Sequence, residues 1–148
     1  MSDDFIDGKP SATFWFAGGA ALLWNLLGLF FYVNTRTSTA ESYAAQGFTP
    51  EQIAFMQGTP EWALSAFAIS VTAGVLASLF LLLRKSWAVP TFILSLVAAV
   101  VLNINSFLLN DSIAVLGMGP VYVQSTVILI GILLILYARS AKAKGWLT

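Results

Sequence analysis

Residues 62–83 read WALSAFAISVTAGVLASLFLLL, an apolar run without a charged side chain. A helix that crosses a bilayer needs about 20 mainly apolar residues, because the hydrocarbon core is about 30 Å thick. Surface helices of soluble proteins instead carry charged or polar residues on the side that faces water. This stretch therefore predicts a membrane-spanning helix.

Three further stretches meet the same requirement. They cover residues 13–33, 89–109 and 119–138, and none contains Asp, Glu, Lys or Arg. A short connection joins the second span to the third, so these two spans should be antiparallel neighbours. The connection between the third and fourth spans is also short. We predict an all-α fold, an integral membrane four-helix bundle that forms a single domain over residues 1–148 and contacts the lipid bilayer.

The composition excludes several classes of protein. The chain is 58% hydrophobic and only 9% charged, whereas soluble domains carry about a quarter charged residues. This argues against a nucleic-acid binder, a disordered chain and a soluble enzyme. The absence of cysteine and histidine removes the thiolate ligand and the commonest general base. We expect no catalytic residue, no cofactor and no metal site, so the protein should not be an enzyme.

The basic residues predict the orientation of the spans. One group flanks the first span, the turn between the second and third spans, and the end of the fourth; only Arg36 falls on the other side. By the positive-inside rule both termini are cytoplasmic, and acidic residues such as Asp3, Asp4 and Asp7 contribute little to this bias. The six residues of the cytoplasmic group are Lys9, Arg84, Lys85, Arg139, Lys142 and Lys144.

The first span has a second interpretation, as a cleaved signal peptide, because small residues follow it at Ser38 and Ala40. However, its apolar run is longer than the roughly 7–15 residues of a signal peptide. The flank before it also carries more acidic than basic residues. A retained membrane anchor is the preferred interpretation.

Residues 34–61 form the only sizeable predicted loop, which the orientation places in the periplasm. Two similar segments, GFTPE at 47–51 and GTPE at 58–61, combine a Thr N-cap with a Pro at the first helical position. We predict a short amphipathic helix over residues 50–57, a possible helical turn over residues 40–45, and a helix start at Pro60. A structured connector is the preferred interpretation of this loop, and a ligand-binding lid is the alternative.

Each span carries a stripe of small or polar residues. Such stripes allow helices to approach closely in lipid, where apolar burial does not drive association. Spacings of three and four residues place the members of each stripe on one helix face. The predicted packing positions are Gly18 and Gly28 in the first span, Ser70, Gly74 and Ser78 in the second, Ser106 in the third and Gly131 in the fourth.

Three amides stand within these stripes, and they have two interpretations. Asn25, Asn103 and Gln124 are the hydrogen-bonding groups that bundles use to join helices. Together with Trp24 and Tyr122 as stacking surfaces, they would also suit a small neutral solute such as a sugar. Hydrogen bonding between helices is the preferred interpretation. No span holds a carboxylate, so a proton-coupled mechanism lacks an obvious carrier.

Three stretches resemble a group of small four-span bacterial inner-membrane proteins that are often labelled sugar transporters. They are LLWNLLG at 22–28, the run from residue 63 to RKSWAVP at 84–90, and YARSAKAKGWL at 137–147. The resemblance implies a multi-pass protein of the bacterial inner membrane and carries no residue roles.

Two functions remain from the sequence. The first is a non-enzymatic accessory or oligomer-forming subunit that packs against a second copy or a partner membrane protein. The alternative is a facilitator for a small neutral, sugar-like solute that acts as an oligomer.

Overall fold

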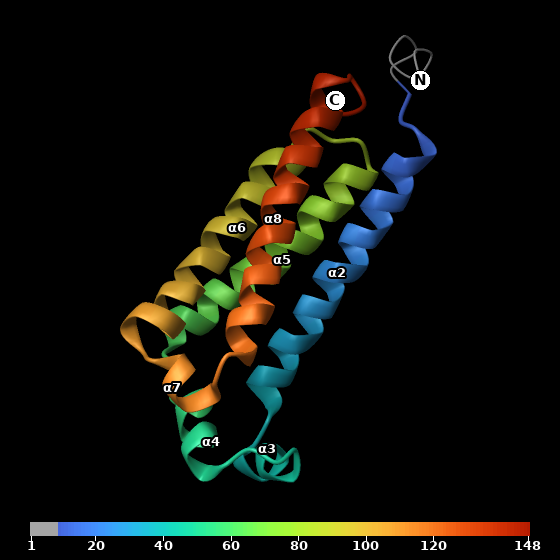
Figure 1. Ribbon diagram of the computed structural model, residues 1–148. Helices are drawn as coiled ribbons and strands as arrows, with labels where there is room; N and C mark the ends of the chain where they lie inside the picture. The colour runs from blue at the N-terminus through green and yellow to red at the C-terminus, as the bar shows by residue number, and fades with distance from the viewer. Residues whose placement is uncertain (1–8) are drawn as a thin grey trace.

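The computed structural model describes residues 9–148 and confirms the all-α four-helix bundle (Figure 1). The long apolar helices are α2 (Ala12–Thr37), α5 (Glu61–Leu82), α6 (Ala88–Asn103) continued by the π-helical segment η1 (Ile104–Leu109), and α8 (Gly119–Ala143). All four are long and apolar enough to cross a bilayer. The chain is therefore a multi-pass membrane protein. Asp3, Asp4 and Asp7 lie outside the described residues.

Two helices extend beyond the apolar runs from which they were predicted. Helix α2 continues to Thr37, and the hydroxyls of Thr35 and Thr37 donate to the carbonyls of Phe31 and Val33, both at 2.9 Å. Helix α8 continues through exposed polar residues to Ala143. An apolar run marks the part of a helix that lies in lipid. The ends of the helix depend instead on the groups that cap its free backbone N–H and C=O groups.

The four spans are packed in the order α2, α5, α6, α8. Helix α5 packs against both α2 and α6. Helix α8 packs against α6. Helices α2 and α8 are not packed against each other along their lengths. Figure 1 shows α8 in front of α5 and α6, with α2 to one side.

Three short helices gather at one end of the bundle, here called the cap end: α3 (Ala40–Ala45), α4 (Pro50–Gln57) and α7 (Ser112–Leu116) (Figure 1). The predicted bounds of α4 are confirmed, and Thr49 and Gln52 form its capping box. The helical turn at residues 40–45 is also present. Helix α4 packs against α3 and α7 and buries Ile53.

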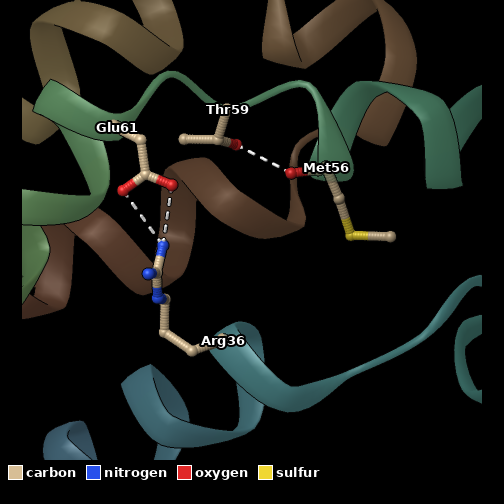
Figure 2. A network of polar contacts seen from close by, with 4 residues as sticks. All are labelled: Arg36, Met56, Thr59 and Glu61. Carbon is tan, nitrogen blue, oxygen red and sulfur yellow. Dashed lines mark hydrogen bonds and ion pairs between the residues drawn. The ribbon is translucent and has the colours of Figure 1, made fainter.

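The predicted N-cap role of Thr59 is wrong. Helix α5 begins at Glu61 with Pro60 as its N-cap, and no side chain caps it. Figure 2 shows why: the Thr59 hydroxyl points back and donates to the carbonyl of Met56 at 2.8 Å. The carboxylate of Glu61 pairs instead with Arg36 at the end of α2, at 3.0 Å. The second TPE segment thus closes one helix before it opens the next.

The connection between the third and fourth spans is more structured than a short turn. It contains α7, whose N-cap Asp111 accepts a hydrogen bond from the amide of Ala114 at 3.2 Å. Gln52 of α4 donates to the carbonyl of Val115 at 3.3 Å. This contact ties the two connections together at the cap end.

The opposite end, here called the basic end, holds the start of α2, the turn between α5 and α6, and residues 144–148 (Figure 1). Residues 144–148 fold back against the turn: the carbonyl of Arg84 accepts from the amide of Thr148 at 2.9 Å, and Arg84 Nε donates to the carbonyl of Trp146 at 2.8 Å. The main buried cluster of the fold lies at this end and includes Phe14, Leu81 and Trp146.

Candidate functional site

A cavity of about 420 Å³ lies between the four spans. Every span contributes to its wall, and most of the lining side chains are apolar. No Asp, Glu, Lys or Arg lines it. Its polar side chains besides Trp24 are Asn25, Thr35, Ser70, Ser95 and Gln124.

Asn25 lies where α2 meets α5. Its Nδ2 donates to the carbonyl of Ala21 at 2.8 Å and to the hydroxyl of Ser78 at 3.2 Å. Ser78 is fully buried and donates to the carbonyl of Gly74. A methyl group at Gly74 would collide with Oδ1 of Asn25, so this glycine makes room for the amide. The stripe of α2 therefore faces the small-residue stripe of α5.

Besides Gly74 of α5, two glycines of α2 set the distance between these helices. A Cβ at Gly18 would lie 2.6 Å from Leu82 Cδ2, and one at Gly28 would lie 3.2 Å from Val71 Cγ1. Both positions therefore hold the two helices closer than a larger residue allows. Gly131 of α8 is placed similarly against Leu96 of α6, at 3.0 Å.

A hydroxyl joins α5 to α6. Ser95 Oγ donates to the carbonyl of Ser70 at 2.7 Å, and Ser95 also lies beside Gly74. No residue pattern within either span predicts that Ser95 pairs with Ser70. The pairing depends on how far α5 and α6 slide along each other, which no local pattern reports.

Asn103 and Gln124 join α6 to α8. Asn103 Nδ2 donates to the carbonyl of Ala99 at 2.7 Å and to Gln124 Oε1 at 3.3 Å. Gln124 lines the cavity, and both residues also line a more open hollow of about 540 Å³ between α6, η1, α7 and α8. The pair thus stands between two spaces. The three predicted amides form two separate contacts, since Asn25 pairs with Ser78.

The two aromatic candidates have different surroundings. Trp24 lines the cavity, which accounts for a tryptophan placed midway along a span. Tyr122 does not line the cavity; its side chain is 67% exposed near the start of α8.

The π-helical segment η1 directly follows Asn103 and contains Asn105 and Ser106. Asn105 is only 5% exposed, and its backbone carbonyl and Oδ1 accept from Asn110 Nδ2 at 3.1 and 3.0 Å. Its amide therefore has a partner within the same chain. Ser106, a predicted packing position, is half-buried within this segment.

The cavity is closed toward the basic end by residues that the stripes did not include. Phe14 of α2 stacks on Tyr137 of α8 at 6.4 Å and meets Trp146 edge-on at 5.8 Å. Phe92 and Leu134 belong to the cavity wall and also contact this cluster. The end of α8 could have been predicted from the sequence, because a glycine is expected just after a helix and Gly145 has a φ of +78°.

The cavity can bind a ligand by hydrogen bonding and apolar contact but not by ion pairing, because no Asp, Glu, Lys or Arg side chain lines it. Among residues 9–148 no group of three or more His, Cys, Asp or Glu side chains could hold a metal ion. Comparison of the chain with protein-family models, with curated proteins and with solved structures gives no match.

Proposed function

We propose that this protein is a small non-enzymatic accessory or oligomer-forming subunit of the bacterial inner membrane. The outer face of α8 is the observation that carries the proposal. Helix α8 buries only Ala138 and Ala141, and its exposed Ser125 lines the open hollow beside Asn103 and Gln124. The Ser125 hydroxyl makes no hydrogen bond to another residue in the described part of the chain, so it is available to a second copy or a partner protein that covers this hollow.

Cross-linking from α8 tests this proposal. The chain has no cysteine, so Ser125→Cys introduces a unique thiol at the hollow. Phe30→Cys is the matched control, because Phe30 is 63% exposed on α2 and lies outside the hollow. We expect a short bis-maleimide to link Ser125→Cys copies, or one copy to a partner, in native membranes and not to link Phe30→Cys copies. A Ser125→Cys protein that stays monomeric and captures no partner argues against the proposal.

The cytoplasmic location of both termini belongs to the same proposal. Its support is that Arg84, Lys85, Arg139, Lys142 and Lys144 gather at the basic end, while Arg36 lies at the cap end. Gln46→Cys and Ser140→Cys place single thiols at exposed positions of the two ends. A membrane-impermeant maleimide should label Gln46→Cys in spheroplasts and Ser140→Cys only after permeabilisation. The reverse pattern would invert the orientation.

A facilitator for a small neutral solute is the second candidate, and the cavity between the four spans favours it. The amides of Asn25 and Gln124 would be its solute contacts. Uptake of a labelled sugar by proteoliposomes should then fall in Asn25→Ala, and also in Asn103→Ala because Asn103 holds the Gln124 amide. Uptake that these substitutions leave unchanged removes this candidate.

A further inference from the structure

The cavity between the spans differs from the hollow on α8 in its shape and in its chemistry. It is the more enclosed of the two, and aromatic rings from α2, α5 and α6 form much of its wall. These include Trp24, Phe67 and Phe92. We infer that this cavity is a binding site for one neutral, lipid-soluble molecule with an apolar body and a hydrogen-bond-accepting oxygen, which enters from the bilayer.

The volume limits the occupant to a small molecule. Small-molecule sites range over about 300–1,000 Å³, and the cavity holds about 420 Å³. One turn of a helix about 10 Å wide and 5.4 Å long already occupies roughly this volume. A transmembrane helix of a partner therefore does not fit inside, whatever covers the outer face of α8.

The lining selects a mainly apolar ligand over a polyol. A sugar carries a hydroxyl on nearly every carbon, and each hydroxyl buried without a partner costs free energy. Part of the hydrogen-bonding capacity of the wall is already used: Asn25 Nδ2 is bonded to Ala21 and Ser78, and the hydroxyl of Ser95 is bonded to Ser70. The walls are otherwise rings and aliphatic chains.

Gln124 supplies the polar contact. Its Oε1 is occupied by Asn103, whereas its Nε2 makes no hydrogen bond to another residue in the described part of the chain. Gln124 lines both the cavity and the hollow, and a free N–H donor in a mainly apolar wall favours a ligand with an acceptor oxygen, such as an ester or ketone carbonyl. The absence of charge in the lining favours a ligand that is neutral.

The route of entry follows from the packing. The basic end is closed by the Phe14, Tyr137 and Trp146 rings. Between the spans, the wall is closed where α5 packs against α2 and α6 and where α8 packs against α6. The unpacked side lies between α2 and α8, and it faces the bilayer. A lipid-soluble ligand reaches the cavity through this side without crossing water.

Quenching of Trp24 fluorescence tests the inference, with the full chain in phosphatidylcholine nanodiscs. The probe is a brominated undecanoate methyl ester, and bromododecane is the matched probe without an acceptor oxygen. We expect the ester to give a saturable quenching component that Trp24→Phe removes. Val127→Phe, which fills the cavity wall, should weaken it, while Leu133→Phe on the 54%-exposed face of the same helix should not.

Gln124→Leu tests the polar contact. Loss of one hydrogen bond should raise the half-saturating mole fraction of the ester about threefold to tenfold and leave that of bromododecane unchanged. Circular dichroism and elution volume check that each variant is folded. Quenching that is linear in probe and equal in Val127→Phe overturns the inference. So does competition by glucose, which would point to a polyol site, and so does equal affinity for both probes, which would indicate an apolar void without recognition.

Discussion

The basic end and the middle of the bundle are built from similar residues and are packed very differently. At the basic end, Phe14 and Leu81 are 0% exposed, and Trp146 fills the space between α2 and α8. Within about three turns the same helices surround a cavity. In lipid, apolar side chains gain little by leaving their surroundings, so an apolar composition alone does not fill the centre of a bundle. Specific closing residues do.

The basic end is closed because two helix ends meet there. Two residues after the end of α5, Arg84 lies in the left-handed region at φ +59°. Two residues after the end of α8, Gly145 does so at φ +78°. Each end has the Schellman hydrogen bonds: Lys85 donates to the carbonyl of Phe80, and Trp146 donates to that of Ala141. The left-handed conformation is unfavourable for arginine, and the bonds from Thr148 and to Trp146 hold it in place.

Phe14→Ala should lower the free energy of unfolding more than the other substitutions do, and so reduce the difference between the two regions. It removes the ring that contacts Tyr137 and Trp146, which leaves a cavity where the bundle is now filled. The expected loss is about 3–5 kcal/mol in the free energy of unfolding. Phe16→Ala is the control on the same helix, because Phe16 is 80% exposed. Denaturant unfolding in micelles measures both, and equal losses would mean that the basic end is not the stable part.

Gly74→Ala tests the packed contact between α2, α5 and α6 beside the cavity. The added methyl group meets Oδ1 of Asn25 and lies 3.3 Å from Ser95 Oγ. Overpacking of this kind costs about 1–3 kcal/mol. Gly19→Ala is the matched control, since no atom lies within 4 Å of a Cβ there. This control should be neutral or stabilising by up to about 1 kcal/mol, and a Gly74→Ala protein as stable as Gly19→Ala would contradict the close approach.

The sequence predicted the spans well because lipid imposes one strong condition on them. Apolar length located all four, and the spacing of Gly18, Asn25 and Gly28 placed them on one face of α2, which lies against α5. Thr49 predicted the start of α4 because its cap bonds to Gln52, three residues away. Features fixed by neighbours within a turn can be inferred from local sequence.

Thr59 is an exception, because Pro and Glu follow it as they follow Thr49, yet its hydroxyl bonds back to Met56, three residues before it. Features fixed by distant partners could not be inferred from local sequence at all. The contact of Trp146 with Phe14 joins residues at the two ends of the chain. The cavity is a further example, because it results from α2 and α8 not packing together, and no residue pattern records a missing contact.

The Asn103–Gln124 pair should have a smaller effect than either packing change. A double-mutant cycle with Asn103→Leu and Gln124→Leu should give a coupling energy of about 0.6 kcal/mol, the mean for hydrogen bonds between membrane helices. The 3.3 Å distance favours a value no larger than this. A coupling energy well above it would show that the pair stabilises the bundle as strongly as the packed contacts do.

Glu61→Gln should have the smallest effect. A single nitrogen of Arg36, Nη1, donates to both carboxylate oxygens of Glu61, at 3.0 and 3.2 Å, but the two side chains are 42% and 78% exposed at the cap end. Water and salt screen such a pair, and holding two long side chains in place costs entropy. Denaturation midpoints of Glu61→Gln and of the unchanged protein should therefore coincide in low and high salt. A salt-dependent loss would mean that this ion pair holds α2 against α5 at the end of the bundle where the closing rings of Phe14 and Trp146 are absent.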